Sequence, residues 1–599
     1  MAARAGGCAP ASLEQPAVID SDSLDFVSLA EDHRPEPRTV YEAALHRLLD
    51  DLFEAQPVWA TQIGFHAFDD RWPDVSESGR SARLAMLRHH RARLEALAQS
   101  ELSADEAIDR GIVLEAIEAM EFDDAELREA AWDPLSYVYL VGSGLFALLA
   151  REFAPWRHRG TAFAGRLRRL PALLDAAASA LVGLPGRPVS LLHTETALNQ
   201  LDGIGELIDE ALAEADRRED AGQDGDVADA LRVAAEPARD AIERFRRSLD
   251  NDVRPRAEGE GRLGAPLFAA KLRHTLASDL TYEALEQRAR QDYDAVRAEM
   301  LRLAREAWPT WLPAEAPPAD DDTLVRRVLD AIAAEHRRPD ELLEWCQSEV
   351  GRIEEFCRAR ELIGLTDEPL RVTWTPVFMR AYGRAFLDSP GPLDKGLSSY
   401  FWITPPDEAA GPDSVESYLR EENDRMLRLL CIHEGIPGHY LQLAWANRSP
   451  SLARAVFASG MFAEGWAVYV TQVMMDAGYG DHEPALLLNH WKFYLRAIIN
   501  ALIDVGIHTA GMTEAAAMSL MTEGGWQEHD EARGKWLRAR LTSTQLSTYY
   551  LGALELTELE AQVRHRQGEA FDLRAHLESV ISHGTPPIKW VRRILLEEG

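Results

Sequence analysis

Apolar residues recur at helical spacing along most of this chain and are separated by short polar breaks. The pattern begins at Thr39 and continues for about two hundred residues in segments rich in alanine, leucine, glutamate and arginine, which are good helix formers. Loops are predicted at 219–226 and, rich in glycine, proline and charge, at 251–266. The pattern therefore predicts a mainly α protein, with two lobes that form one structural unit. Its parts are a flexible tail (1–38), an N-terminal helical lobe (39–250) and a second lobe (251–599).

Capping residues locate helices in the second lobe. Thr281 can cap a long helix that runs to about residue 307, with Glu283 in its first turn. A proline-rich loop is predicted over 308–322, and Thr323 is expected to begin the next helix. The second lobe is thus expected to be as helical as the first.

Two short segments break the helical pattern and predict β-strands. Residues 370–375 alternate in polarity and end at Pro376, and residues 399–404 are rich in aromatic side chains and end at Pro405. Both segments shortly precede the stretch with the strongest chemical signal. A small sheet, in the simplest case a structural hairpin, is expected beside that stretch.

The most distinctive stretch reads Cys-Ile-His-Glu-Gly-Ile-Pro-Gly-His-Tyr over 431–440, at the end of a helical segment over 415–430. Zinc peptidases hold their metal with a His-Glu pair on a helix, a second histidine and a later glutamate. The usual motif places the two histidines at i and i+4. Here position i+4 is Pro437, and the next histidine is His439. On a regular helix, His439 would lie about 240° around the axis from His433.

Pro437 and Gly438 offer a way to bring the two histidines together. Proline has no N–H to bond the carbonyl of His433, and its ring crowds that carbonyl. Gly438 permits unusual backbone angles, including positive φ. We therefore expect a bulged turn that returns His439 to the side of His433. The alternative is a helix that stops at Pro437, with His439 as its cap.

The run His433-Glu-Gly-x-Pro-Gly-His-x-x-Gln442, followed by Glu464-Gly-Trp-Ala, resembles the bacterial Domain of Unknown Function 885 family. That family is similar to the Glu-zincin metallopeptidases, and the resemblance extends from about residue 40 to the C-terminus. It implies a zinc ion (Zn2+) held by His433, His439 and Glu464, with Glu434 as the base. It also implies a large two-lobed, metallopeptidase-like helical fold with a deep central cleft. The edge of the small sheet would then pair with an extended peptide.

Charged residues outside the metal motif are candidates for substrate contacts. Asp504 and His508 are one helical turn apart, so their pairing would orient the imidazole and favour its protonated form. We expect His508 to hold substrate or the developing oxyanion, and Arg496, two turns before Asp504, to bind substrate. The alternative is a buried structural network. Lys271 and Arg273, in a block that the family shares, either bind a substrate carboxylate or lie on a solvated helix face.

A further block, Gln545-Leu-Ser-Thr-Tyr-Tyr-Leu-Gly552, has the glutamine, tyrosine and glycine found in the family. Tyr549 matches the family's tyrosine, and a phenol is a neutral donor suited to an oxyanion opposite the metal. Gln545 and the adjacent Tyr550 are candidate substrate-binding residues. Core packing is the alternative for either tyrosine.

Composition narrows the possible partners and compartment. The net charge of −35 argues against a nucleic-acid partner, which needs clustered Lys and Arg. The 4 cysteines show no Cys-x-x-Cys pairing, which predicts a cytoplasmic protein with neither a disulfide framework nor a thiolate zinc site. No apolar run approaches transmembrane length, so no membrane association is expected. The start, ending at Cys8, faintly resembles a lipoprotein cleavage site but lacks the apolar core of a signal peptide, and we interpret it as a tail.

The sequence therefore predicts a zinc-dependent hydrolase that cleaves short peptides with a metal-activated water. Two alternatives stay open. The same residues suit a biosynthetic or detoxifying amidohydrolase that acts on a small non-peptide amide. A chain whose bulged motif no longer holds metal would instead be a helical binding scaffold.

Overall fold

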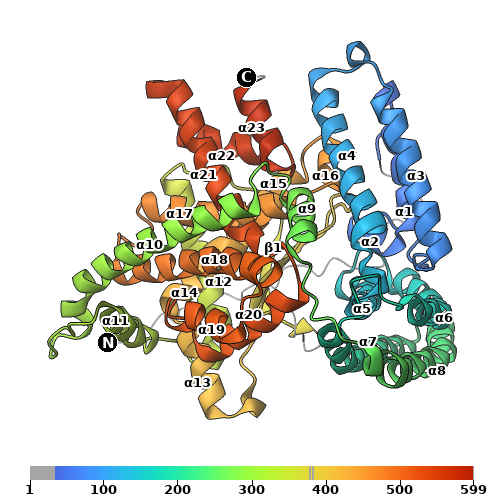
Figure 1. Ribbon diagram of the computed structural model, residues 1–599, viewed down its shortest axis with the longest axis horizontal. Helices are drawn as coiled ribbons and strands as arrows, with labels where there is room; N and C mark the ends of the chain where they lie inside the picture. Colours follow the sequence, from blue (N-terminus) through green and yellow to red (C-terminus); the bar gives the residue numbers. More distant parts are fainter. Residues whose placement is uncertain (1–33, 377–378, 381–382, 598–599) are drawn as a thin grey trace, which may run out of the picture.

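The computed structural model describes residues 34–376, 379–380 and 383–597, and helices dominate it, which confirms the mainly α prediction (Figure 1). The tail predicted for 1–38 lies mostly outside the described residues. In Figure 1 the first eight helices lie on the right-hand side of the molecule. These are α1 (Val40–Ala55), α2 (Pro57–Gln62), α3 (Glu77–Glu95), α4 (Ala104–Phe122), α5 (Leu135–Ala150), α6 (Trp156–Ala180), α7 (Leu191–Asp220) and α8 (Gly225–Ser248).

The remaining helices lie mainly on the left and at the top of Figure 1 and surround a small sheet. They are α9 (Ala265–Leu276), α10 (Tyr282–Trp311), α11 (Asp321–Ala333), α12 (Leu342–Ala359), α13 (Pro412–Glu421), α14 (Asp424–Leu430), α15 (His439–Ala446), α16 (Leu452–Val456), α17 (Gly460–Asp476), α18 (Pro484–Ala510), α19 (Glu514–Thr522), α20 (His529–Leu541), α21 (Ser547–Gln567), α22 (Leu573–Ile581) and α23 (Ile588–Leu596).

Side-chain caps mark the helix starts, and two predicted helix boundaries need correction. Thr281 caps α10 as predicted. The helix runs on to Trp311, beyond the predicted end, and its last turns bury Trp308. Next, α11 begins before Thr323, because the Asp320 side chain accepts the Thr323 backbone N–H at 2.8 Å and caps the helix itself. Aspartate is a strong N-cap, so it takes precedence over the threonine three residues later.

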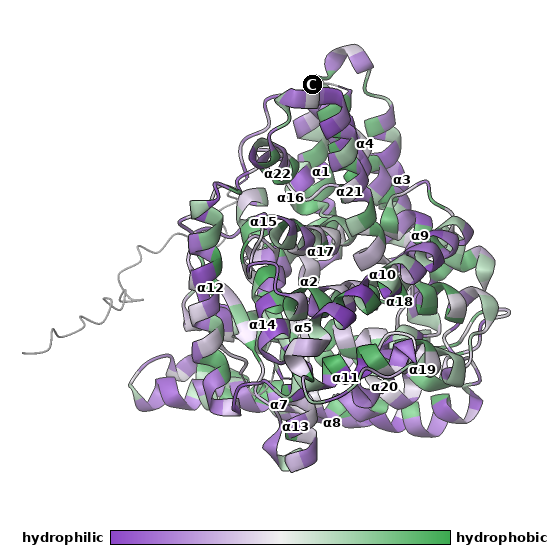
Figure 2. Ribbon diagram, turned by 90° about the vertical axis from the view of Figure 1, so that its left-hand side faces the viewer, coloured by the Kyte–Doolittle hydropathy of each residue, from purple (hydrophilic) through white to green (hydrophobic). Residues whose placement is uncertain are grey.

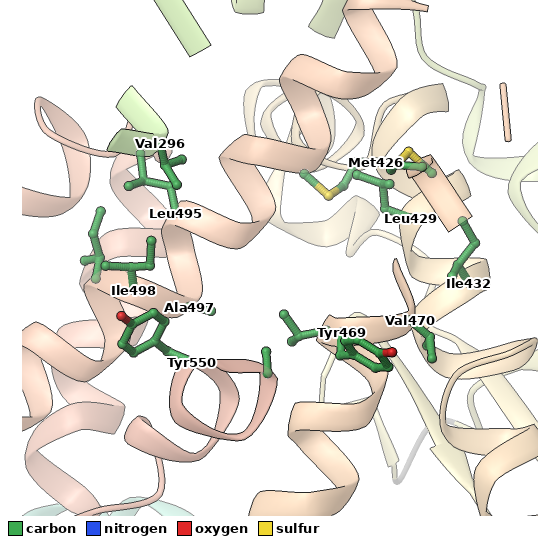
Figure 3. Packing of buried hydrophobic residues seen from close by; sticks show 14 of the residues in the cluster. Val296, Met426, Leu429, Ile432, Tyr469, Val470, Leu495, Ala497, Ile498 and Tyr550 are labelled. Carbon is green, nitrogen blue, oxygen red and sulfur yellow. The ribbon is translucent and has the colours of Figure 1, made fainter. Parts of the chain in front are cut away.

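Buried apolar side chains form separate clusters that follow the two groups of helices. On α8 the buried positions recur every three or four residues from Val227 to Phe245, and this stripe packs with α6 in a cluster that spans 135–257. The largest cluster draws on residues 268–591 (Figure 3). A third cluster joins α1 and α4 to α16, and Trp590 and Ile594 of α23 pack against it, so the N-terminal helices contact the C-terminal part of the chain. The helices carry mixed hydrophilic and hydrophobic stretches, as amphipathic elements do (Figure 2). The lobe boundary near residue 250 stays a prediction.

The sheet has three strands in the order β1-β3-β2. They are β1 (Leu370–Trp374), β2 (Ala385–Asp388) and β3 (Ser399–Ile403). The two predicted strands are confirmed, but they pair in parallel, with Leu370 opposite Ser399, so they are not a hairpin. β2 pairs antiparallel with β3 and was missed, because its four residues are all half-buried and show no alternation. β2 is consequently an edge strand.

Two further findings concern compartment. Within the described part of the chain, no single helix has the length and apolar composition to cross a membrane, although one bent pair, Ala104–Ala131 with Leu135–Ala150, meets that test jointly. The three described cysteines, Cys346, Cys357 and Cys431, are free and buried.

Candidate metal centre

The helical segment predicted over 415–430 is two helices, α13 and α14, because Asn423 interrupts it. The Asn423 side chain accepts the backbone N–H groups of Arg425 and Met426 and so begins α14. A π-helical turn, Cys431–Gly435, follows and carries His433 and Glu434. Ile436 is then extended, and the chain bends through Pro437 and Gly438 before α15 begins at His439. The two histidines thus lie on different helical segments, and the geometry of a continuous helix does not separate them.

The bulged turn returns His439 to the side of His433, as predicted. The two ring centroids are 4.8 Å apart, and the Gly438 N–H donates to the carbonyl of Ile432 at 3.0 Å. The positive φ expected for Gly438 is not found, because its φ is −71° with a ψ of −139°. Glycine is needed instead because two backbone carbonyl groups approach this position closely. A Cβ on Gly438 would lie 2.0 Å from the carbonyl oxygen of His433 and 2.3 Å from that of Ile432.

A tryptophan of α17 is hydrogen-bonded to this turn. The Trp466 indole N–H donates to the carbonyl of Pro437 at 2.9 Å, and the peptide bond before Pro437 is cis. Trp466 is among the largest fully buried side chains of the protein. The turn is therefore anchored to α17, the helix that also carries Glu464.

Polar side chains converge on the inner side of the turn. His433, Glu434 and His439 each present a ligand atom, and these atoms lie within 4.8 Å of one another. Glu464 adjoins them, with its Oε2 atom 3.5 Å from Nε2 of His439. The three closest residues thus include Glu434. Glu464, the predicted third ligand, contacts this group through His439. Two imidazoles with a carboxylate are the donors that catalytic zinc sites use, so these residues fit a zinc ion.

Burial and mutual contacts set the protonation of this group. Burial lowers the pKa of His433 to about 3, so its ring is neutral and can offer a lone pair. Burial raises the pKa of Glu434 to about 7, although the Leu387 N–H donates to its Oε2 atom at 3.0 Å. Burial opposes the charge on His439, yet the contacts with Glu464 and Glu434 raise its pKa. Burial also opposes the charge on Glu464, and the bond to His439 outweighs it and lowers the pKa of the glutamate.

A glycine contact between α17 and α21 brings Glu464 and Tyr549 together. A Cβ on Gly465 would lie 2.4 Å from Cα of Gly552, and a Cβ on Gly552 would lie 2.3 Å from the carbonyl oxygen of Met461. The two backbones therefore touch where the helices cross. Glu464 precedes one glycine and Tyr549 lies one turn before the other. Burial and then the charge of Glu464 raise the pKa of Tyr549, so the phenol stays protonated.

Two donors hold the Tyr549 hydroxyl. The Gln545 amide and the Arg538 guanidinium each donate to its oxygen at 3.2 Å, and Arg538 also bonds the Gln545 carbonyl at 2.9 Å. Since both contacts use the hydroxyl as an acceptor, its proton can be donated to a third group. Sequence reasoning missed Arg538, because it is one of several arginines on a polar helix and belongs to no motif.

The hydrogen-bond partners of His508 differ from those expected and fit the structural alternative. Its Nδ1 atom accepts the Leu263 N–H at 3.4 Å, and its other nitrogen donates to the carbonyl of Thr542 at 2.9 Å. Burial lowers the pKa of His508 to about 4, so the ring is neutral rather than protonated. Asp504 lies 4.0 Å away, and it accepts instead from Thr544 and Ser547 at the start of α21. His508 is a structural residue with both nitrogens occupied.

Tyr550 and Lys271 also have structural partners. The Tyr550 side chain is fully buried beside α18, among the core residues shown in Figure 3, and its hydroxyl donates to Asp292 at 2.6 Å. Tyr550 points away from Tyr549 because adjacent residues on a helix are about 100° apart. Lys271 Nζ is bonded to Glu129 at 2.9 Å and to Ser543 at 2.8 Å.

The remaining two predicted substrate contacts lie in different settings. Arg273 is exposed on α9, which is the solvated helix face of the alternative interpretation. Arg496 is largely buried and is hydrogen-bonded to Glu421. Its guanidinium lies 5.9 Å from the ring of Phe493, which in turn lies 5.4 Å from the His433 ring. Arg496 is therefore close to the candidate metal centre but is held by an ion pair.

Comparison with known proteins places this geometry in a family. No curated protein matches the chain. A solved structure described as a putative lipoprotein of unknown function from Shewanella oneidensis is 31% identical, covers 94% of this chain and 100% of its own, and has a TM-score of 0.81. The crystal structure of a putative lipoprotein from Colwellia psychrerythraea is 15% identical, with 93% and 98% coverage and a TM-score of 0.77, and shows the fold alone. The sequence model of a family described as bacterial protein of unknown function (DUF885) matches residues 57–595, and the chain therefore belongs to this family.

Proposed function

We propose that this protein is a zinc-dependent hydrolase that cleaves amide bonds of short peptides. The observation that carries the proposal is the convergence of His433, Glu434 and His439 on one buried turn, with Glu464 and Tyr549 beside them. Two nitrogen donors with a carboxylate are typical of catalytic zinc, and a glutamate next to the first histidine is the usual base.

The ligands in this proposal are His433, His439 and Glu464. When bound, zinc would polarise a scissile carbonyl and lower the pKa of a water molecule to about 7. Glu434 is held at one oxygen by the Leu387 N–H, so its other oxygen is free to accept a proton from the attacking water. The same carboxyl group then delivers that proton to the leaving amine.

Tyr549 supplies a neutral donor to the same reaction. Gln545 and Arg538 fix its oxygen at 3.2 Å each and leave its proton for the oxyanion of the substrate. A preorganised donor of this kind contributes about 3–4 kcal/mol to the stability of a tetrahedral intermediate. Arg538 is exposed, so this side of the centre can be reached from solvent.

The edge strand β2 suits an extended peptide substrate. The Arg384 carbonyl accepts the Thr404 N–H at 2.8 Å, so Arg384 faces β3, and alternation turns Ala385 and Leu387 outward. Leu387 already donates its N–H to Glu434. A peptide that pairs with this edge would lie next to the base and would be held through its backbone, without selection for side chains. We place this site in a cleft between two helical lobes, as the Glu-zincin resemblance implies.

The location in this proposal differs from the cytoplasmic prediction. Both solved structures named above are described as putative lipoproteins, the first at 31% identity. We therefore propose that this protein too acts outside the cytoplasm. Cell fractionation with an antibody against the chain tests this, and recovery in the cytoplasmic fraction alone would restore the original prediction.

Metal content and a peptide panel test the activity. Protein purified without chelators should contain about one zinc ion per chain by elemental mass spectrometry, and should hydrolyse short peptides until a chelator is added. Zinc with activity only on non-peptide amides would support the amidohydrolase alternative. A chain with neither zinc nor activity would support the binding scaffold.

Glu434→Gln is the sharpest variant for the mechanism, because it keeps the shape of the side chain but cannot accept a proton. It should retain zinc and lose a factor of roughly 10²–10⁴ or more in turnover. Glu408→Gln makes the same chemical change on an exposed residue and should leave turnover unchanged. Near-normal turnover in the Glu434 variant would remove this residue from the mechanism.

A further inference from the structure

A buried cluster of charged side chains lies beside the candidate metal centre. It joins the residue before β2, the end of α13, and inner faces of α18 and α20, which packs against α18. We call it the charged cluster, and its members are Arg384, Glu421, Glu422, Lys492, Arg496, Glu531 and Lys535. Four of these groups are cationic and three are carboxylates, so the cluster carries one excess positive charge when all are ionised.

One carboxylate in the cluster is fully satisfied. Glu421 accepts Lys492 at one oxygen, at 3.0 Å, and Arg496 at the other. Burial opposes its charge, yet these two cations lower the pKa of Glu421 to about 2. Lys492 therefore has a structural partner in place.

The other cations are paired loosely. Lys535 Nζ lies 3.5 Å from Glu531, and the guanidinium of Arg384 lies 3.8 Å from Glu531 and 3.3 Å from Glu422. The Lys535 side chain is only 8% exposed, and burial lowers its pKa to about 8. Within the described residues, Nε of Arg496 is also buried without a hydrogen-bond partner. In the same part of the chain, Oε2 of Glu422 is buried without a partner as well. A buried charge is costly unless it is hydrogen-bonded, so charges of both signs are incompletely paired at this end of the cluster, and its cations outnumber its carboxylates.

Three separate elements connect the cluster to the candidate metal centre. On α18, the Phe493 ring lies between Arg496 and His433. On α20, Lys535 is one turn before Arg538, the residue that bonds the Tyr549 hydroxyl. Just before β2, Arg384 is three residues from Leu387, whose N–H contacts Glu434. Arg384, at 32% exposed, is the most accessible cation of the cluster.

We propose that Lys535, Arg496 and Arg384 form a subsite that binds a carboxylate of the substrate. This inference rests on the proposed function, because it supplies the anchor for a peptide laid along β2. Three residues of extended strand span about 10 Å, so the carboxylate belongs two or three residues from the bond beside Glu434. A C-terminal carboxylate or an acidic side chain meets this description. In the first case the enzyme releases a short C-terminal fragment.

Peptide binding tests the subsite without requiring turnover. Protein carrying Glu434→Gln is titrated calorimetrically with Ala-Phe-Ala as the free acid, with Ala-Phe-Ala amide, and with Ala-Phe-Glu amide. The free acid should bind roughly tenfold or more tightly than its amide, as a charge-assisted hydrogen bond predicts. Tight binding of the Glu amide as well would identify an acidic side chain as a second source of the carboxylate. Equal affinity for all three would overturn the proposal, even if the protein proves to be a hydrolase.

Substitutions within the cluster separate the subsite from a general effect of charge. Lys535→Met should abolish the preference for the acid, and Lys535→Arg should largely keep it. Lys492→Met removes the same charge from the partnered side of the cluster and should leave the preference intact. The proposal fails if Lys535→Met and Lys492→Met reduce the preference equally. If Lys535→Met does not fold, the comparison of acid and amide in the parent still decides the matter.

Discussion

A methyl group at Gly438 should displace a proposed metal ligand without unfolding the protein. Real Cβ atoms essentially never approach another atom within 3.0 Å, and a Cβ at this position would lie 2.0 Å from the His433 carbonyl oxygen. In Gly438→Ala, the turn must therefore open by about 1 Å, the difference between these distances. Zinc–ligand distances are held within about 0.2 Å, so a shift of this size pulls His433 and His439 apart as ligands.

We expect Gly438→Ala to weaken zinc binding roughly 10- to 100-fold or more. Competition with a fluorescent zinc chelator measures this affinity, and circular dichroism verifies that the helices persist. Gly435→Ala is a matched control in the same turn, because its Cβ would meet only Val350, at an ordinary 3.8 Å. The reasoning is refuted if folded Gly438→Ala protein binds zinc as tightly as Gly435→Ala does.

Three further predictions concern packing, a structural histidine and pH. Gly552→Ala places its Cβ 2.3 Å from a backbone oxygen of α17 and should lower the free energy of unfolding by about 1–3 kcal/mol. In the control Gly534→Ala the Cβ has nothing within 4 Å, so this free energy should not fall. Thermal denaturation measures both variants. His508→Gln should lose about 1–3 kcal/mol of stability with zinc affinity unchanged, and a variant of full stability that loses turnover would restore the oxyanion role. Burial opposes the charge on His66, but hydrogen bonds to Asp394 and Asp69 raise its pKa to about 9. The hydrogen bonds of protonated His66 stabilise the folded protein fully below about pH 6.5, and this stabilisation is lost as the pH rises through 9 and the ring loses its proton. The Tm should therefore fall over this window more steeply than the Tm of His66→Gln. Equal dependence of Tm on pH in the parent protein and in His66→Gln would contradict this prediction.

The sequence by itself determined the features that depend on near neighbours. Thr281 caps α10, residues 370–374 and 399–403 are strands, and the Pro437-Gly438 pair bends the chain so that two histidines meet. Each of these follows from interactions within one or two turns, where capping, side-chain alternation and the missing proline N–H act. The residue types of the candidate centre could be predicted for the same reason, because they lie in two compact motifs.

Only the tertiary structure decided which downstream polar residues reach that centre. Tyr549 and Tyr550 are adjacent and chemically alike, yet on α21, which contacts α17, Tyr549 lies within electrostatic reach of Glu464, whereas Tyr550 is hydrogen-bonded to Asp292. The hydrogen-bond partners of His508 could not be predicted because Thr542 and Leu263, which occupy its nitrogens, are distant in sequence. Periodicity along a chain shows which side chains face a core. It does not show which distant element supplies their hydrogen-bond partners, because that depends on how helices cross.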